Sequence, residues 1–157
     1  MTEGKLKIVG FMEKNLTPNG YDLTIGEVLV PSLSSLHSEG TARISPKTWF
    51  LVSTMEFLEL GPRLSGDLWI RTTWARRGII PSFGKVDAGF KGNLTLSAFN
   101  ASEEEIALPV GDTFAQITIH ELGTPPSRTY PESSGTYQGQ KGVTLSRSSG
   151  QGRSDPG

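Results

Sequence analysis

The residues best suited to chemistry in this sequence are two arginines and two threonines in one short run, residues 71–76 (RTTWAR). Guanidinium groups, hydroxyls and the backbone N–H groups at the start of a helix are what a polyphosphate requires. The run lacks the GxxxxGK[ST] pattern and is therefore not a P-loop. A strand end with exposed arginines would have the same sequence, so both interpretations stay open for the run alone.

Two further segments carry carboxylates in glycine-rich surroundings. Residues 84–92 (GKVDAGFKG) hold three glycines, Asp87 and the aromatic Phe90. Glycine lets a backbone approach a ligand closely, and Asp87 in such a place can act as a general base on water. A β-hairpin with an Asx turn is the alternative. Asp22, in the turn-like run 20–23 (GYDL), can hold a metal through water or simply cap a turn.

The elements that must position these residues are expected to be strands. Short runs with alternating polar and apolar residues, rich in β-branched and aromatic types, indicate an all-β sandwich or barrel. These runs are residues 48–57, 66–73, 93–100 and 113–122. A short helix is predicted over 72–78, ended by Gly78. The turn-like runs 100–103 and 109–112 are predicted to be hairpin connections.

The composition excludes several classes of function. The chain has 157 residues, which favours one domain, and 15 Lys and Arg against 16 Asp and Glu give a net charge of -1. Because basic residues are not in excess, the composition does not favour nucleic-acid binding. Cysteine is absent, so disulfides and thiolate metal sites are excluded. His37 and His120 are expected to be ordinary surface or strand residues. No signal peptide or apolar run of about 20 residues is found, so a cytoplasmic protein without a membrane partner is predicted.

The composition changes at Gly123. Of the last 35 residues 22 are Gly, Ser, Pro or Thr, and only Val143 and Leu145 are aliphatic. We therefore divide the chain into a β domain, residues 1–122, and a tail, residues 123–157. The composition fits a disordered terminus, whereas the run 137–142 (YQGQKG) fits a segment that closes over an anionic ligand. Residues 103–105 (EEE) are expected to be a solvated loop.

Taken together, these segments resemble the dUTPase and dCTP deaminase superfamily, and in particular archaeal-type dUTPases of the deaminase-like branch. The resemblance extends from residue 16 to residue 147. It rests on five motifs in order: 18–23 (PNGYDL), 71–76 (RTTWAR), 86–92 (VDAGFKG), 111–116 (GDTFAQ), and Tyr130 with 136–142 (TYQGQKG). It implies an all-β distorted jelly roll (β-clip), a homotrimer with active sites between subunits, and a flexible C-terminal lid.

One position separates the two activities of the superfamily. Deaminases of this kind carry a glutamate ten residues beyond the motif aspartate, and here that position is Ser97. A serine without an activating base cannot move protons between water and the cytosine ring near pH 7. The resemblance therefore implies a dUTP diphosphatase. A dCTP deaminase, with or without dUTP hydrolysis as a second activity, and a non-catalytic nucleotide-binding regulator remain the alternatives.

The resemblance also implies roles for individual residues. Asp87 activates a water that attacks the α-phosphate of deoxyuridine triphosphate, giving dUMP and pyrophosphate. Mg²⁺ bridges the phosphates without a direct protein ligand, with Asp22 in contact only through water. The residues expected to bind phosphates are Arg71, Thr72, Thr73 and Arg76. Those expected to contact the base or sugar, or to complete the site as the tail closes, are Phe90, Thr95, Ser97, Gln116, Tyr130, Thr136 and Gln140. Thr136 stands where the family has a lysine, and Lys141 can replace that contact.

Overall fold

The structure is a computed structural model that describes residues 5–147. It is almost entirely β. The strands are β1 (Lys7–Val9), β2 (Leu16–Thr17), β3 (Gly20–Val30), β4 (Ser35–His37), β5 (Thr41–Ile44), β6 (Thr48–Thr54), β7 (Phe57–Glu59), β8 (Leu64–Ile70), β9 (Ile79–Ser82), β10 (Lys91–Gly92), β11 (Thr95–Asn100), β12 (Ile106–Pro109) and β13 (Thr113–Glu121). One short helix, α1 (Thr72–Ala75), and 3-10 turns at Glu13–Asn15, Pro31–Leu33 and Tyr130–Glu132 complete the described chain. No helix within residues 5–147 is long and apolar enough to cross a membrane.

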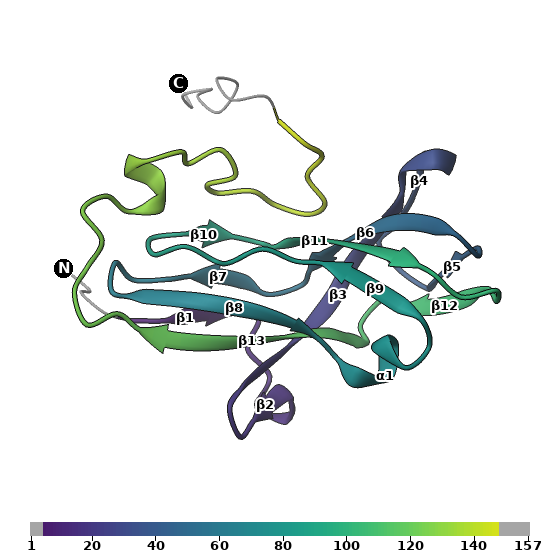
Figure 1. Ribbon diagram of the computed structural model, residues 1–157, viewed down its shortest axis with the longest axis horizontal. Helices are drawn as coiled ribbons and strands as arrows, with labels where there is room; N and C mark the ends of the chain where they lie inside the picture. Colours follow the sequence, from purple (N-terminus) through teal and green to yellow (C-terminus); the bar gives the residue numbers. More distant parts are fainter. Residues whose placement is uncertain (1–4, 148–157) are drawn as a thin grey trace.

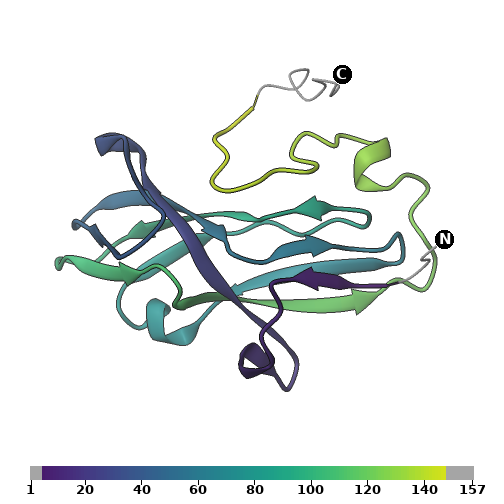
Figure 2. The same cartoon turned by 180° about the vertical axis from the view of Figure 1, so that it is seen from behind.

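The largest sheet curls into an almost closed barrel (Figures 1 and 2). Its strand order is β8-β13-β3-β6-β11-β9, and β2 and β4 also pair with β3. A three-stranded sheet, β1-β7-β10, and the pair β5-β12 extend it. The predicted all-β jelly-roll class is confirmed.

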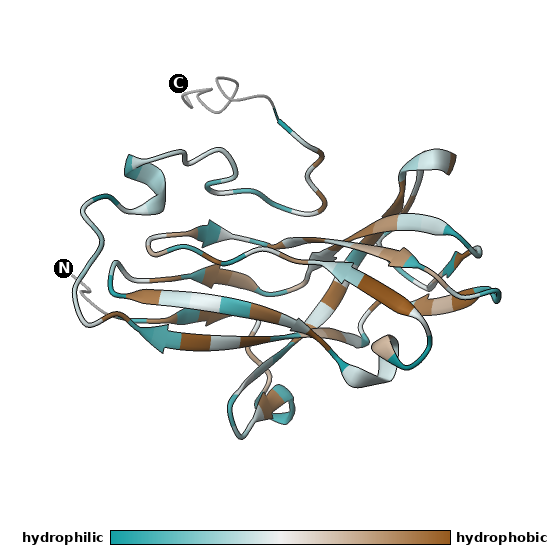
Figure 3. Ribbon diagram, in the orientation of Figure 1, coloured by the Kyte–Doolittle hydropathy of each residue, from teal (hydrophilic) through white to brown (hydrophobic). Residues whose placement is uncertain are grey.

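Period-two patterning explains why these segments are strands. Along β11, Leu96 and Ala98 are buried while Thr95 and Ser97 are half-buried, so one face of the strand points to the core. The same alternation is visible as bands of polar and apolar colour along the strands in Figure 3. Phe114 lies at the centre of the core, with its ring 6.2 Å from that of Phe50. Burial of such apolar surface is the main force that stabilises the fold.

The two end strands of the barrel path, β8 and β9, are joined by a loop rather than by a ladder. β9 and β11 pair antiparallel as the arms of a hairpin, and residues 83–94 form its long tip, which we call the aspartate loop. In this loop Val86 exchanges two backbone hydrogen bonds with Gly66 of β8, at 2.9 and 2.8 Å. The loop that carries Asp87 is therefore also what closes the barrel.

The run 48–57 is two strands, not one. β6 ends at Thr54 and β7 begins at Phe57, because the chain turns at Met55 and buries Glu56 completely. The Glu56 carboxylate accepts a hydrogen bond from the backbone N–H of Thr24, 2.9 Å away. A buried carboxylate needs such partners, and they lie on a strand far away in sequence.

The turns at 100–103 and 109–112 were wrongly expected to be hairpin connections. Both flank β12, which pairs with β5, whereas β11 pairs with β6 and β9, and β13 pairs with β3 and β8. Each turn therefore passes the chain from one sheet to another. Glu103, Glu104 and Glu105 are exposed as expected, and Glu103 and Glu105 lie within 2.9 Å of Lys47 and Arg43, respectively.

The short helix α1 begins directly after β8, as predicted. Trp74 anchors it: the indole is buried and donates from Nε1 to the carbonyl of Thr113, 2.8 Å away. Gly78 ends the turn with a φ of 88°, a conformation that glycine adopts without strain. The buried Trp74 leaves Thr72, Thr73 and Arg76 on the exposed side.

Candidate functional site

A pocket of about 160 Å³ lies between the aspartate loop, β11 and the tail. We call it the aspartate pocket. Five residues predicted to form the site line it: Asp87, Phe90, Thr95, Tyr130 and Gln140. Asp87 is exposed at the pocket, and it carries the only carboxylate among the described residues that line it.

The aromatic wall of the pocket joins the loop to the tail. Phe90 is buried, and its ring meets that of Tyr130 edge-on with centroids 5.6 Å apart. Tyr130 also donates its backbone N–H to the carbonyl of Ala88, 2.8 Å away, and its hydroxyl accepts the N–H of Tyr137 at 2.9 Å. The ring contact between Phe90 and Tyr130 adds a directional term to their burial.

The described part of the tail, residues 123–147, is docked along the aspartate loop of its own chain (Figure 1). The Gln138 side chain bonds both to the N–H of Lys91 and to the carbonyl of Gly89, each at 3.1 Å. Further along, the N–H of Val143 donates to Glu27 on β3 at 2.8 Å, and that of Thr144 to the Thr95 hydroxyl at 3.0 Å. These bonds hold the tail over the pocket. The last ten residues of the predicted tail lie outside the described residues.

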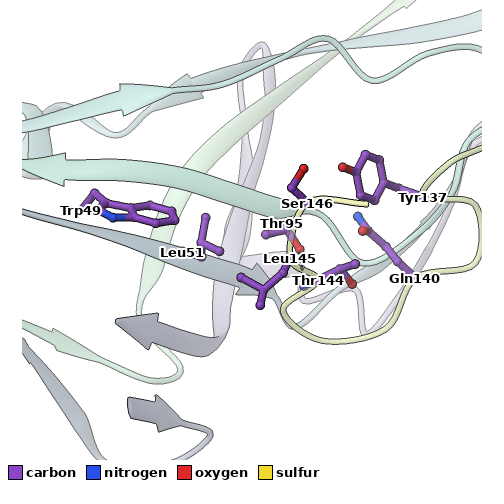
Figure 4. Close-up of a pocket in the computed structure, with 8 residues that line it drawn as sticks. All are labelled: Trp49, Leu51, Thr95, Tyr137, Gln140, Thr144, Leu145 and Ser146. Atoms are coloured by element: carbon purple, nitrogen blue, oxygen red, sulfur yellow. Dashed lines mark hydrogen bonds between the residues drawn. The ribbon is translucent and has the colours of Figure 1, made fainter. Parts of the chain in front are cut away.

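A second, larger cavity adjoins the aspartate pocket, with a volume of about 500 Å³ (Figure 4). Trp49 and Leu51 of β6 line it on the barrel side, and Thr144, Leu145 and Ser146 on the tail side. Thr95, Tyr137 and Gln140 line both cavities. This apolar cleft is open to a partner or a ligand beside the pocket, and Trp49 is 46% exposed in it.

Three of the other predicted residues, Asp22, Arg71 and Gln116, gather at a second place. Together with Thr113, which was not predicted as a site residue, they form what we call the arginine cluster. Arg71 follows β8, and its Nε lies 2.9 Å from Asp22 Oδ2 on β3. The same guanidinium donates to the hydroxyl of Thr113. Gln116 of β13 is directly opposite Asp22 in the ladder. The cluster therefore fixes Arg71 from two strands.

None of the arginine-cluster residues lines the aspartate pocket, nor do Thr72, Thr73 and Arg76. α1, which carries Thr72 and Thr73 and is followed directly by Arg76, lies at the lower right of Figure 1, whereas the docked tail runs along the top. Within one chain the predicted phosphate-binding residues therefore lie outside the aspartate pocket. Gln116, which was predicted to contact the base or sugar or to complete the site, lies opposite Asp22 instead of in the pocket.

Two predicted contact residues do not line the aspartate pocket. Ser97 is half-buried on β11, opposite Leu51 and Ser82, and lies two residues beyond Thr95 along the strand. Thr136 is half-buried in the tail, and its carbonyl accepts a bond from Arg147 at 3.3 Å. Lys141, the suggested replacement, is exposed.

The structure adds pocket residues that the motifs did not single out. Tyr137 lines both cavities and lies within the run 137–142, which was predicted to fit a segment that closes over a ligand. Lys85 lines the pocket two residues before Asp87, and its Nζ is 2.6 Å from Asp67 of β8. The hydrogen bond from Lys85 lowers the pKa of the Asp67 carboxyl, and His120, 3.0 Å away on β13, acts in the same direction. Lys85 could have been predicted as a pocket residue from its position two residues before the motif aspartate.

The residues around the arginine cluster are compatible with a divalent ion that binds together with a phosphate ligand. Among residues 5–147 no three His, Asp or Glu side chains gather as a metal site. Asp22 is committed to Arg71, with an exposed fraction of only 12% for its side chain. Such a carboxylate would reach an ion only through a water molecule, and the direct ligands would be phosphate oxygens and waters.

Comparison with known proteins points to one family. Residues 30–122 match the family model described as dCTP deaminase-like. A dCTP deaminase of Thermococcus sibiricus is 41% identical over 145 residues, covering 91% of each chain. A dUMP-forming dCTP deaminase of Aquifex aeolicus is 32% identical, covering 92% of this chain and 87% of the relative. A probable deoxyuridine 5'-triphosphate nucleotidohydrolase of Sulfolobus islandicus rod-shaped virus 1 is 32% identical, covering 91% and 89%.

Solved structures show the same fold. The dCTP deaminase of Agrobacterium tumefaciens matches with a TM-score of 0.63 at 19% identity, over 74% of this chain but only 43% of that one. The EIAV dUTPase matches with a TM-score of 0.58 at 18% identity, over 79% and 94%. The chain therefore belongs to the dCTP deaminase-like family, within the superfamily of dUTPases and dCTP deaminases.

Proposed function

We propose that this protein is a dUTP diphosphatase that converts dUTP to dUMP and pyrophosphate. The observation that carries the proposal is the lone carboxylate of Asp87 in a pocket walled by Phe90 and closed by the tail. One carboxylate is sufficient to take one proton from water. Deamination at cytosine C4 requires a group that also returns protons to the ring nitrogen and the leaving amine, and position 97 offers only a serine hydroxyl.

In the proposed reaction Asp87 takes a proton from a water whose oxygen attacks the α-phosphorus. The new bond forms between that oxygen and phosphorus, and the bond from the α-phosphorus to the bridging oxygen breaks. Pyrophosphate leaves with the electron pair. Arg71 and Arg76, with the hydroxyls of Thr72 and Thr73, bind the phosphates and offset the negative charge that grows in the transition state.

The nucleoside is proposed to bind in the aspartate pocket. Phe90 offers an apolar surface to the deoxyribose, and Thr95 lies on the strand whose backbone faces the base. Tyr130 and Gln140 come from the docked tail, which keeps bulk water out of the pocket and so strengthens polar contacts inside it. Mg²⁺ bound with the substrate would neutralise phosphate charge, and Asp22 would contact it only through water.

The proposed assembly is a homotrimer with active sites between subunits. It is supported by the separation of the arginine cluster from the aspartate pocket within one chain, because hydrolysis needs Arg71 and Asp87 at one phosphate group. The apolar cleft beside Trp49 offers a surface on which another subunit can bring its arginine cluster to the pocket. A site shared by subunits is compatible with closed rotational symmetry.

A dCTP deaminase is the second candidate, and the names of the relatives favour it. A non-catalytic nucleotide-binding regulator is the third. The alternatives differ in product, so one experiment separates all three. The purified protein is incubated with Mg²⁺ and either dUTP or dCTP, and pyrophosphate and ammonia are followed together.

We expect pyrophosphate from dUTP and no ammonia from dCTP. Ammonia from dCTP would replace the proposal with deamination and would require a proton carrier other than residue 97. Binding of dUTP without either product would favour the regulator. The Asp87→Asn variant is the matched control for contaminating phosphatases, because it should bind dUTP and release no pyrophosphate.

A further inference from the structure

Asn93, which lies between β10 and β11, bonds to both the barrel and the tail. Its Nδ2 donates to the carbonyls of Thr54 and Glu56, at 3.0 and 2.9 Å, in the turn between β6 and β7. Its Oδ1 accepts the backbone N–H of Gly142 at 3.3 Å. Its backbone N–H donates to the carbonyl of Gln140 at 3.0 Å, and its own carbonyl accepts Gln140 Nε2 at 2.6 Å.

These bonds determine how the Gln140 amide is oriented. Because Nε2 is held by the carbonyl of Asn93, Oε1 must point the other way. Gln140 is 7% exposed, lines the aspartate pocket, and its Oε1 has no hydrogen-bond partner among the described residues. A buried acceptor without a partner is costly, so a ligand donor that reaches it gains the bond that the protein lacks.

The chemistry of that donor is restricted. An amide oxygen only accepts, so it recognises an N–H or O–H group and gains nothing from a carbonyl or phosphate oxygen. With its triphosphate ionised, dUTP carries two such donors, the uracil N3–H and the sugar 3′-OH. The unpartnered acceptor of Gln140 can therefore be satisfied by only these two groups of the substrate.

We propose that Asn93 is a positioning residue for nucleoside recognition. It clamps the tail to the turn between β6 and β7 and so presents Gln140 Oε1 to a hydrogen-bond donor of the deoxynucleoside. The proposal rests on the proposed function in so far as the ligand is a deoxynucleoside triphosphate. It assigns to Asn93 no contact with the substrate.

The chain contains a matched control at the other end of β11. Asn100 donates from Nδ2 to the carbonyls of Ile44 and Glu104, at 3.0 and 2.8 Å, and its Oδ1 accepts the N–H of Ser102 at 3.1 Å. It is fully buried, as a structural clamp would be, but it does not line the aspartate pocket. Truncating Asn100 therefore removes the same kind of bonds as truncating Asn93 without affecting Gln140.

The test compares Asn93→Ala, Asn100→Ala, Gln140→Met and the Asn93→Ala/Gln140→Met double variant. Binding of a non-hydrolysable α,β-imido analogue of dUTP is measured by calorimetry, and unfolding temperature is recorded for each protein. Loss of the two side-chain anchors is expected to weaken binding about 5- to 30-fold in Asn93→Ala. Asn100→Ala should keep wild-type affinity, whatever its unfolding temperature. The double variant should be no weaker than the weaker single variant, because Asn93 acts through Gln140.

Two further nucleotides identify the donor. 3-Methyl-dUTP lacks the N3–H, and 2′,3′-dideoxy-UTP lacks the 3′-OH. Wild type and Asn100→Ala should discriminate against one of them, and Asn93→Ala and Gln140→Met should lose that discrimination. Gln140→Met changes only the tail, so it keeps the test decisive should Asn93→Ala fail to fold.

Equal losses in Asn93→Ala and Asn100→Ala, additive losses in the double variant, or unchanged discrimination in Gln140→Met would overturn the proposal. Binding without hydrolysis would contradict the diphosphatase while leaving the measurement on Asn93 valid. Failure of the wild type to bind dUTP or dCTP would contradict both proposals.

Discussion

The arginine cluster and the aspartate pocket are built in different ways. In the arginine cluster the strand ladder sets the geometry: Gln116 is opposite Asp22, and Arg71 directly follows β8, which pairs with the same strand as Asp22 does. The aspartate pocket depends instead on a loop and on a tail from the far end of the chain. A ladder pre-forms one half of the proposed site, whereas the other half forms only when the tail docks.

The two regions also differ in what they lack. The Asp22 carboxylate is already paired with Arg71 and is not available to activate water. The aspartate pocket has a carboxylate at its surface but no arginine among the residues that line it. Each region therefore supplies the chemistry that the other is missing, which is the physical reason to expect that both are needed for turnover.

The largest effect is expected at Asp87. Asp87→Asn removes the general base while keeping the size of the side chain, so dUTP hydrolysis should fall about 10²- to 10⁴-fold. Affinity for the non-hydrolysable analogue should change little, since no phosphate contact is lost. The matched control is Asp112→Asn, in which the acceptor for the Thr113 N–H is retained. Rapid pyrophosphate release by Asp87→Asn would remove Asp87 from the reaction.

Arg71 is expected to have the next largest effect. Arg71→Ala removes charge that stabilises the transition state and should lower kcat about 10²- to 10³-fold. It also leaves Asp22 unpaired and mostly buried, which costs up to about 3–5 kcal/mol in the free energy of unfolding. Adding Asp22→Asn should restore stability but not activity, as measured by denaturant unfolding and pyrophosphate release. Arg43→Ala, which breaks an exposed pair with Glu105, serves as the control, and a similar loss there would contradict the prediction.

Complementation tests whether the two regions meet between chains. Arg71→Ala and Asp87→Asn are each expected to be inactive alone, but coexpressed in equal amounts they should recover about a quarter of wild-type turnover, because random assembly pairs intact residues from different subunits at that frequency. Sites contained in one chain would give no recovery. The measurement is pyrophosphate release from the purified mixed oligomer. The control is a mixture of the two separately purified variants under conditions in which they do not exchange subunits.

Local patterning was enough to predict several of the strands, whereas the site residues were predicted from the resemblance to a known superfamily. Alternation located β8, β11 and β13, because one face of each strand is buried. What it could not predict was pairing between distant segments. Glu56 interrupts an apolar run because its partners Tyr21 and Thr24 lie on β3, and burial raises the pKa of the Tyr21 hydroxyl there. The prediction that the two turns beside β12 are hairpin connections was wrong for the same reason, since a turn sequence does not say which strands pair.

The candidate site divides in the same way. Residues carried by motifs, such as Asp87 and Arg71, were predicted because their types match their proposed chemistry. Asn93 was missed because its role depends on carbonyls at residues 54–56 and on the tail, none of which is near it in sequence. Ser97 was placed among the contacts by motif position alone. It shares a face of β11 with Thr95 but lies two residues further along the strand, and it does not line the pocket.

The smallest effect is expected for the ion pair that ties the aspartate loop to β8. The unfolded pKa of the Asp67 carboxyl is near 3.8, and the hydrogen bond from Lys85 holds its folded pKa below that value. A carboxyl with a lowered folded pKa stabilises the fold above its unfolded pKa, and that contribution disappears as the pH falls through the folded pKa. Asp67→Asn should therefore lower the unfolding temperature slightly at pH 7 and in low salt, and the difference from wild type should vanish as the pH falls through the folded pKa of Asp67.

The matched control is Asp112→Asn, because the Asp112 carboxylate forms no ion pair with a lysine or arginine within the described residues. The Asp67–Lys85 pair is exposed and easily screened, whereas the Asp22–Arg71 pair is mostly buried, so salt should weaken the first much more than the second. If salt and acid instead loosened both regions equally, the distinction between a ladder-built half and a docked half would lose its physical basis. Thermal unfolding of Asp67→Asn and Asp22→Asn across ionic strength decides between the two outcomes.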